Sequence, residues 1–520
     1  MNVVVIGAGI GGLTAAARLA AGGFDVTVCE RGRRPGGKMR RVAVAGDEID
    51  AGPTVFTKRA VFDALFSDCG ERLDDHVTIT RSDVIARHVF ADGARLDLHA
   101  DRAHSVEAVK AFSGARSARE FSAFMARADG VLDLLDPIFM SAQKPRSPIA
   151  LTMRAGFGGA MRIARLGATK SFWQAVRDEF SDPRLQCLFA RYMTYVGSSP
   201  FEAPATLRLI AAVEARGVWR VAGGMSRLAE AVEGLARRRG AIFRYEAAVD
   251  RILVDQDRAA GVLLSSGETI AADLVLANCD ADALALGHLG NEARAACEAP
   301  TAPRDRSLSA LGIAVKARVS GPPLAHHTVF FAPDPMREFT EIFKERRLPS
   351  DPNVYVCAED RGDDARGPCG PERLFLIVNA PALSDETQPF EQTEVERCTN
   401  AAFSRLAASG LTLDFKGGGI SLSTPSEYSA LYPGTGGALY GRVSHGSTAS
   451  FRRPDARSRI PGLYLCGGSA HPGAGVPMAS LSGTLAVEAI VKDLASTRRS
   501  GRAAMPGGIA TRSRTTASSD

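Results

Sequence analysis

The sequence lacks the features that mark several common classes of protein. Its nine cysteines are scattered and form no C-x-x-C pair, so neither a zinc site nor a disulfide framework is predicted. It has no run of about 18 apolar residues, the length needed to span a membrane. Its first residues lack the basic segment of a signal peptide. We therefore expect a cytoplasmic protein, the usual setting for unpaired cysteines.

An excess of charge of one sign is also missing outside one short segment. The formal net charge is +5, and residues 496–520 hold five arginines against a single acid, Asp520. The rest of the chain is close to neutral, so no nucleic-acid partner is expected. The 496–520 segment is rich in Ser, Thr, Gly and Arg, which predicts a disordered basic tail.

Glycine, by contrast, is abundant, with 52 residues in 520, and one cluster has a clear order. The apolar run 2–6 predicts a strand of a parallel sheet that is buried on both faces. The glycine-rich run 7–12 follows it, and then come an Ala-rich helix over 13–21 and a second strand over 25–29. With Glu30 at its end, this is a complete βαβ unit with the spacing of a dinucleotide site.

Each element of that unit has a physical role. Gly7 permits the tight turn, Gly9 lets the backbone approach a pyrophosphate, and Gly12 lets the helix pack close to the strand. The helix N-terminus favours the phosphate charge. Glu30 can accept both ribose hydroxyls and would repel a 2′-phosphate, which disfavours NADP and leaves NAD and FAD open. The predicted cofactor contacts here are Gly7, Ala8, Gly9, Ile10, Gly11, Gly12 and Glu30.

A second motif, Gly36-Gly37-Lys38-Met39, follows Glu30 after five residues. At this point the sequence resembles the flavoproteins with two dinucleotide-binding domains, a superfamily that includes amine oxidases and carotenoid desaturases. The resemblance implies FAD as the cofactor. It also implies an α/β fold, in which an amine-oxidase-like, Rossmann-type FAD-binding domain carries an inserted α+β substrate domain.

The far end of the chain supports the same interpretation. Residues 461–488 predict a buried strand over 463–466, a glycine-rich turn and a helix from about Met478. In the resembled family this segment lies along the flavin. Val249 is equally consistent with an adenine contact and with a buried strand residue. The further FAD contacts that the resemblance implies are Arg31, Gly36, Gly37, Lys38, Met39, Gly52, Pro53, Thr54, Val249, Gly467, Gly468, Gly475, Val476 and Met478.

The order of these motifs predicts a discontinuous FAD-binding domain. Residues 149–173 interleave apolar side chains with Arg and Lys, a pattern that fits either a membrane surface or a core helix with a solvated edge. The predicted parts are an FAD-binding domain over 1–70, 205–280 and 451–495, a helical substrate or membrane segment over 71–204, a sheet-containing substrate domain over 281–450, and the tail over 496–520.

Three segments resemble a narrower group. The run Y-L-C-G-G-S-A-H-P-G-A-G-V-P at 464–477 resembles the C-terminal signature of bacterial phytoene-desaturase type carotenoid desaturases, with Ala470 at a position where threonine is usual. Residues 50–57 and 326–331 resemble the branch of that family that acts on 1-hydroxylated acyclic carotenoids in phototrophic bacteria. The resemblance covers almost the whole chain except the tail.

The resemblance implies a desaturase that forms the C3–C4 double bond of a 1-hydroxycarotenoid, by hydride transfer to flavin N5 and loss of a proton. It implies a hydrophobic carotenoid substrate and peripheral association with the inner membrane. A phytoene desaturase, a flavin amine oxidase and a non-oxidising carotenoid carrier or isomerase remain alternatives. The sequence does not reveal the electron acceptor.

The catalytic residues are unknown at this stage. His471 either exchanges protons or hydrogen-bonds its turn. The pair His326-His327 has no third ligand nearby in the sequence, so no metal is expected. A substrate hydroxyl in an apolar tunnel needs a polar partner, since leaving it unpaired costs roughly 1–3 kcal/mol. The candidates for that partner are Thr54, Thr57, Arg59, His327 and Thr328.

Overall fold

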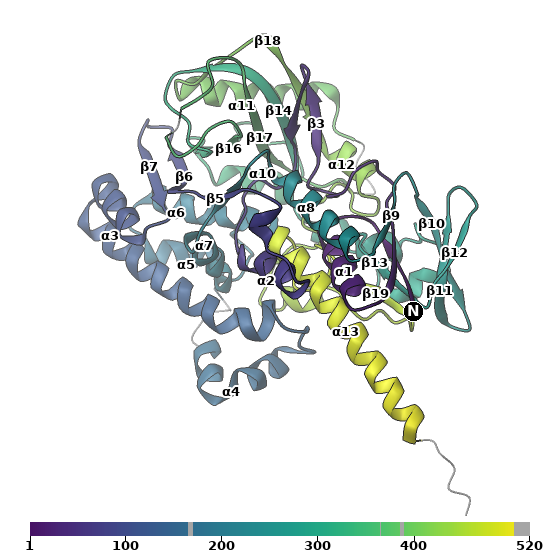
Figure 1. Cartoon of the computed structure of the whole chain (residues 1–520). Coiled ribbons are helices and arrows are strands. Elements are labelled where there is room, and N and C mark those ends of the chain that lie inside the picture. Colours follow the sequence, from purple (N-terminus) through teal and green to yellow (C-terminus); the bar gives the residue numbers. More distant parts are fainter. Residues whose placement is uncertain (165–169, 365, 385–388, 504–520) are drawn as a thin grey trace, which may run out of the picture.

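A computed structural model describes residues 1–164, 170–364, 366–384 and 389–503 (Figure 1). Its first layer is a five-stranded parallel sheet in the order β19-β13-β1-β2-β9. The strands are β1 (Asn2–Ile6), β2 (Asp25–Cys29), β9 (Ile242–Arg244), β13 (Leu274–Ala277) and β19 (Leu463–Leu465). All five lie within the ranges predicted for the discontinuous FAD-binding domain.

The central strand β1 shows why an uninterrupted apolar run forms here. Val3 and Val5 pack against helices on one face of the sheet, and Val4 and Ile6 pack on the opposite face. The helices are α1 (Ile10–Ala21), α2 (Ala60–Asp68), α8 (Met225–Arg238) and α13 (Val476–Ala503). The other face is covered by a three-stranded antiparallel sheet of β10 (Val249–Asp255), β11 (Arg258–Leu264) and β12 (Thr269–Ala271).

Helices α1 and α13 come from opposite ends of the chain and pack against each other (Figure 1). A Cβ on Gly483 would overlap the carbonyl oxygen of Gly11, so the two backbones approach closely at this pair. Beside it, Thr14 Oγ1 and Ser480 Oγ share a buried hydrogen bond of 2.8 Å. The turn that begins α1 is thereby fixed to the turn that begins α13.

A second, seven-stranded sheet has the order β18-β14-β17-β16-β15-β6-β7. Its strands are β6 (Val84–Val89), β7 (Arg95–His99), β14 (Ser309–Ser320), β15 (His327–Phe330), β16 (Val354–Ala358), β17 (Glu372–Ala380) and β18 (Thr412–Ser423). Helix α11 (Gln392–Ala408) covers one face. The other face turns toward the aromatic cluster of the 100–200 region, which includes Phe124 and Phe189.

The 71–204 segment, expected to be helical, also supplies strands β6 and β7 to this sheet, with β6 parallel to β15. These strands are short and precede the long helix α3. Most apolar residues of the segment therefore recur at helical spacing, which hides the strands in the sequence. The helices of this segment are α3 (Arg102–Leu135), α4 (Pro148–Ala164), α5 (Phe172–Glu179) and α6 (Pro183–Ala190).

The remaining elements are short. The helices are α7 (Leu209–Ala215), α9 (Ala281–Ala285), α10 (Arg337–Phe343) and α12 (Pro425–Leu431). The strands are β3 (Arg41–Val44), β4 (Asp47–Asp50), β5 (Ile79–Arg81) and β8 (Trp219–Val221).

The C-terminal part differs from the prediction of a tail that is disordered from residue 496. Helix α13 continues to Ala503, and the arginines at 498, 499 and 502 are good helix formers. Residues 504–520 of the predicted tail lie outside the described residues. Among those that are described, no helix has the length and apolar character needed to cross a membrane.

Candidate functional site

A cavity of about 840 Å³ opens at the carboxyl ends of the parallel strands and extends to the seven-stranded sheet. Its walls come from the segments that follow β1, β2, β13 and β19, and from Phe375 and Ile377 of β17. In α/β folds, ligands bind at this edge of the sheet because the loops there converge. The volume lies within the range of about 300–1,000 Å³ that is usual for ligand sites.

The turn between β1 and α1 leaves its backbone open to this cavity. Gly7 has a φ of +93°, which favours glycine, and α1 begins at Ile10. A Cβ on Gly9 would lie 2.8 Å from Asn278 Nδ2, so only a glycine fits without displacing that side chain. The first turn of α1 contains no acidic residue. Its free N–H groups therefore suit a phosphate.

Glu30 lies beside this turn at the end of β2. Its carboxylate accepts hydrogen bonds of 2.7 Å from the backbone N–H of Ala8 and of 2.7 Å from that of Gly32. These bonds fix the carboxylate in place and leave one lone pair on each oxygen. The geometry is compatible with acceptance of two ribose hydroxyls.

Lys38 connects the second glycine motif to the 430–440 segment. Its Nζ donates to the Leu439 carbonyl at 2.7 Å and lies 5.3 Å from the centre of the Tyr432 ring. Burial lowers the pKa of Lys38, and the charge of Asp280 partly opposes this shift. The side chain thus forms part of the cavity wall and is only partly exposed.

The glycine-rich segment after β19 is held by a buried arginine, Arg453. Its guanidinium donates to the carbonyls of Gly468 at 3.1 Å, Arg442 at 3.0 Å and Tyr440 at 3.2 Å. Burial lowers the pKa of Arg453 to about 10. Since Gly468 and Tyr440 both line the cavity, Arg453 joins two of its walls.

The predicted cofactor contacts fall into two groups. Those that line the cavity are Gly7, Gly9, Ile10, Gly11, Glu30, Arg31, Gly36, Gly37, Lys38, Met39, Gly52, Pro53, Val249, Gly467, Gly468, Gly475 and Val476. Ala8, Gly12, Thr54 and Met478 lie next to the lining but are not part of it. A Cβ on Gly12 would overlap the Gly7 carbonyl oxygen, so its glycine serves the packing of the turn.

The segment that carries Gly52 and Pro53 is anchored by a pair of buried acids. The Asp50 carboxylate accepts hydrogen bonds from Ser226 N at 3.0 Å and Ser226 Oγ at 2.6 Å. The Asp50 N–H donates to Glu359 Oε1 at 2.8 Å. Burial and the negative charge of Asp50 raise the pKa of Glu359 to about 8.

We expect Glu359→Gln to make the stability of the protein less sensitive to alkaline pH. The pKa of Glu359 rises from 4.5 to about 8 on folding, so its contribution to stability is complete below 4.5 and is lost as the pH rises through 8. Glutamine keeps an acceptor for Asp50 but does not ionise. The stability of the variant relative to the parent should rise by up to about 1.4 kcal/mol per pH unit across this window.

Urea unfolding at about pH 5 and about pH 9 measures this change. Glu107→Gln, an exposed carboxylate on α3, is the control and should show the same difference from the parent at both pH values. An equally constant difference for Glu359→Gln would contradict the prediction.

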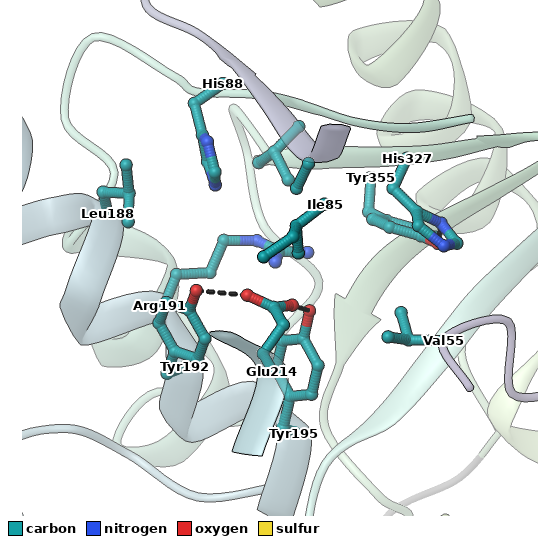
Figure 2. A pocket seen from close by; sticks show the side chains of 12 residues that line it. Val55, Ile85, His88, Leu188, Arg191, Tyr192, Tyr195, Glu214, His327 and Tyr355 are labelled. Atoms are coloured by element: carbon teal, nitrogen blue, oxygen red, sulfur yellow. Dashed lines mark hydrogen bonds between the residues drawn. The ribbon is translucent and has the colours of Figure 1, made fainter. Parts of the chain in front are cut away.

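A second cavity, of about 10 Å³, lies on the same face of the seven-stranded sheet (Figure 2). This is close to the space of one water molecule. Glu214 lines it and accepts hydrogen bonds from Tyr192 OH and, at 2.6 Å, from Tyr195 OH. His327 and Arg191 also line it. Sequence reasoning found only His327, because the other residues come from a segment without a recognisable motif.

The other residues proposed for the substrate hydroxyl are occupied elsewhere. Arg59 pairs with Asp63 at 3.3 Å and Asp74 at 2.5 Å, and Thr328 Oγ1 donates to the Ala325 carbonyl at 3.1 Å. Thr57 lines neither cavity. Thr54 Oγ1 bonds Tyr355 OH at 2.6 Å, and that tyrosine lines the small cavity.

His471 does not line either cavity. Its Nε2 lies 3.0 Å from the Ala142 carbonyl, and its ring contacts Phe139 edge-on at 4.9 Å between centroids. Burial lowers the pKa of His471, which favours the neutral ring. These contacts connect its turn to the 139–142 segment and give it no direct route to a substrate.

The pair His326-His327 has a third neighbour that the sequence did not suggest. Cys357 lies opposite His327 in the adjacent strand, and the ligand atoms of all three residues lie within 4.8 Å of one another. Burial raises the pKa of the Cys357 thiol well above its usual range, so it keeps its proton. The expectation of no metal stays a prediction.

Asn278 and Arg453 are the structural residues that sequence reasoning missed. Asn278 follows β13, and its Nδ2 donates to the Gly7 carbonyl at 3.2 Å, between the two glycine-rich segments. Asn278 could have been predicted, because it directly follows a buried strand. That position lies at the edge of the sheet where the loops converge.

Comparison with known proteins gives a consistent picture. Residues 10–365 match the family model described as flavin containing amine oxidoreductase. The chain is 47% identical to a hydroxyneurosporene desaturase of Rubrivivax gelatinosus, over 99% of this chain and 98% of that protein. It is 46% identical to a hydroxyneurosporene desaturase of Cereibacter sphaeroides, over 96% and 99%. A solved oxidoreductase from Methanosarcina mazei, at 18% identity, shares the fold with a TM-score of 0.61 over 95% of this chain and 100% of its own.

Proposed function

Because the chain belongs to the flavin containing amine oxidoreductase family, we propose that it is an FAD-dependent carotenoid desaturase. Its reaction is formation of the C3–C4 double bond of acyclic 1-hydroxycarotenoids. The observation that carries this proposal is the similarity over nearly the full length of both chains to two hydroxyneurosporene desaturases. A similarity of this extent includes the seven-stranded sheet as well as the FAD-binding segments.

The residues around the large cavity fit FAD. Glycines at 9, 11 and 467 leave a cradle in which any Cβ would press on Asn278. A helix N-terminus and a fixed carboxylate at Glu30 lie at one end, where a diphosphate and a ribose need them. The other end reaches Phe375 and Ile377 of the seven-stranded sheet, so a flat ring system there would face an apolar wall.

When bound, FAD supplies the hydride acceptor for this chemistry. The chain's own residues orient the substrate and exclude water. Loss of hydride next to a conjugated polyene leaves an allylic cation, whose neighbouring proton is acidic enough for a weak acceptor. The site therefore needs no strong base, which agrees with the absence of a catalytic dyad among the described residues that line the large cavity.

Purified protein with FAD and liposomes tests the proposal. Each added conjugated double bond shifts the carotenoid spectrum to the red, so 1-hydroxyneurosporene should give a red-shifted product. Anaerobic substrate should bleach the flavin. Conversion of phytoene without conversion of hydroxycarotenoid would overturn the branch, peroxide release from polyamines alone would favour an amine oxidase, and no bleaching under any condition would favour a carrier.

We also propose that helix α4 lies on the membrane that holds the substrate. It presents three large apolar side chains to solvent, with exposed fractions of 73% for Ile149, 77% for Met153 and 48% for Met161. Arg154, between two of them, is exposed as well. Basic charge beside an exposed apolar face is typical of a helix that binds anionic lipid. The predicted stretch continues over 165–169, which lies outside the described residues.

The double variant Ile149→Glu/Met153→Glu should reduce binding to anionic vesicles by roughly 10- to 100-fold, because each side chain loses its burial in lipid. Vesicle flotation measures the bound fraction. Ile420→Glu, which replaces an apolar side chain of 47% exposure on β18, is the matched control. Figure 1 places β18 far from α4. Equal flotation of the double variant and the parent would refute the α4 surface.

A further inference from the structure

One row of side chains on β17 lines the large cavity and changes from apolar to polar along its length. Alternate residues of a strand face opposite sides of the sheet. Phe375, Ile377 and Asn379 line the cavity, whereas Leu376 and Val378 pack in the core under α11. Asn379 thus ends a row that begins with two apolar side chains.

On the neighbouring strand β14, an alanine faces Asn379. Ala310 is paired in register with Asn379, and it lines the same cavity. Ser309 precedes it and also lines the cavity, but its register partner Ala380 packs in the core under α11. Strand alternation therefore points the side chain of Ser309 toward that core. The carboxamide of Asn379 is left beside a methyl group in this part of the wall.

A buried carboxylate behind the wall sets the orientation of the Asn379 amide. Asn379 Nδ2 donates to Glu338 Oε1 at 2.6 Å, and Glu338, on α10, is 1% exposed. Its Oε2 accepts from Asn353 N at 2.8 Å and from Asn353 Nδ2 at 2.6 Å. The Asn353 amide is fixed in turn, because its Oδ1 accepts from the Ala332 N–H at 3.0 Å. Burial raises the pKa of Glu338, but these N–H donors oppose the shift. Both carboxylate oxygens thus serve as acceptors and hold the amide nitrogen of Asn379.

This orientation leaves the amide oxygen of Asn379 for the cavity. Among the described residues, Asn379 Oδ1 has no hydrogen-bond partner. An amide oxygen accepts but does not donate. A ligand group that satisfies Oδ1 must therefore carry an O–H or N–H, and a group that only accepts meets its lone pairs.

We propose that Asn379 Oδ1 accepts the hydrogen bond of the C1 hydroxyl of the carotenoid, and that Glu338 is the positioning residue that keeps this oxygen toward the substrate. This inference rests on the proposed function and adds the residue that selects the hydroxylated end. Three bonds separate the C1 oxygen from C3, at most about 4 Å. A hydroxyl held at about 2.8 Å from Oδ1 then places C3 within about 7 Å of it. Two residues along a strand also span about 7 Å, so the reacting bond lies near Ile377 in the same cavity.

The substituent at C1 decides how well this acceptor is satisfied. A hydroxyl donates to Oδ1. A methoxy oxygen can only accept, so it cannot pair with Oδ1 while Glu338 holds the amide nitrogen. A hydrocarbon end leaves Oδ1 unpaired, and sites built to bond a substrate hydroxyl reject such analogues strongly.

The first test replaces Asn379 by leucine, which has a similar shape but no acceptor. It compares kcat/KM for 1-hydroxyneurosporene with kcat/KM for neurosporene, its hydrocarbon counterpart, on the FAD-loaded enzyme in liposomes. In Asn379→Leu the hydroxyl-to-hydrocarbon ratio should fall roughly 5- to 150-fold, because the hydroxyl is left unpaired. A parent-like ratio would overturn the proposal.

The second test reverses the Asn379 amide and remains informative if Asn379→Leu does not fold. In Glu338→Gln the two donors of Asn353 keep the glutamine oxygen at the position of Oε2, so the new NH₂ group takes the position of Oε1. Asn379 then turns its oxygen toward that NH₂ group and its own NH₂ group toward the cavity. A methoxy oxygen accepts from this donor, so kcat/KM for 1-methoxyneurosporene relative to 1-hydroxyneurosporene should rise roughly 2- to 13-fold. An unchanged ratio would overturn the positioning role of Glu338.

Glu341→Gln is the matched control, because Glu341 lies on the same helix, is also 1% exposed and lines neither cavity. Both ratios should stay at their parent values in this variant. A loss of FAD affinity in Asn379→Leu with parent-like substrate ratios would place Asn379 against the coenzyme and overturn the proposal. A parent enzyme that converts none of the three carotenoids would instead overturn the proposed function.

Discussion

Replacing Gly11 by alanine is expected to remove most of the FAD from the purified protein. A Cβ there would lie 2.8 Å from Asn278 Oδ1, 2.9 Å from the Ala479 carbonyl oxygen and 3.0 Å from Gly467 Cα. Two of these neighbours are backbone atoms, one in α13 and one in the glycine-rich segment after β19, and backbone atoms cannot rotate away. Such overpacking costs about 1–3 kcal/mol, so FAD affinity should fall roughly 5- to 150-fold.

Flavin absorbance per protein and the FAD dissociation constant measure this loss. Gly234→Ala, inside α8, is the control, because its Cβ would meet only the flexible end of Arg238 at 3.0 Å. That change should stabilise the protein by up to about 1 kcal/mol through helix propensity and leave FAD binding intact. If Gly11→Ala protein carried as much FAD as the parent, α1 and the glycine-rich segment after β19 would not meet as described.

Arg453→Met is expected to cost at least about 3 kcal/mol of stability and to weaken FAD binding. The substitution leaves the carbonyls of Tyr440, Arg442 and Gly468 without their buried donor, and each unpaired group costs roughly 1–3 kcal/mol. The loop from 467 to 476 would then lose its connection to the 440–442 segment. Both walls of the large cavity should become mobile.

Urea unfolding gives the free energy, and flavin titration gives the affinity. Arg459→Met is the matched control, since that side chain is 66% exposed and pairs with Glu298 only at 3.6 Å. Its stability should stay within about 0.5 kcal/mol of the parent. A small effect of Arg453→Met on both measurements would mean that the loop is held by other contacts.

The nucleotide end could be predicted because its signals are local. The strand over 2–6, the glycine order of 7–12 and the acid at 30 are contiguous, and each has one physical reason. The FAD-binding fold and the family follow from these motifs and are supported by the comparisons.

The small cavity could not be predicted, because its residues meet only through the fold. Glu214 lies on α7, Arg191 follows α6, and His327 begins β15. Glu214 and Arg191 belong to no motif, and a buried Glu bonded by two tyrosines has no sequence signature. Cys357 beside His327 depends in the same way on the register of β15 with β16. Arg453 resembles any other arginine until its carbonyl partners are known.

The position of β1 between strands from distant parts of the chain has a consequence for synthesis. The first strand leaves the ribosome early, but its neighbour β13 and the edge strand β19 are translated hundreds of residues later. At about 5–20 residues per second the nascent chain waits roughly 20–90 s for β19. During that interval the coenzyme has no complete cradle, so flavin loading must follow the synthesis of β19 and of the glycine-rich segment after it.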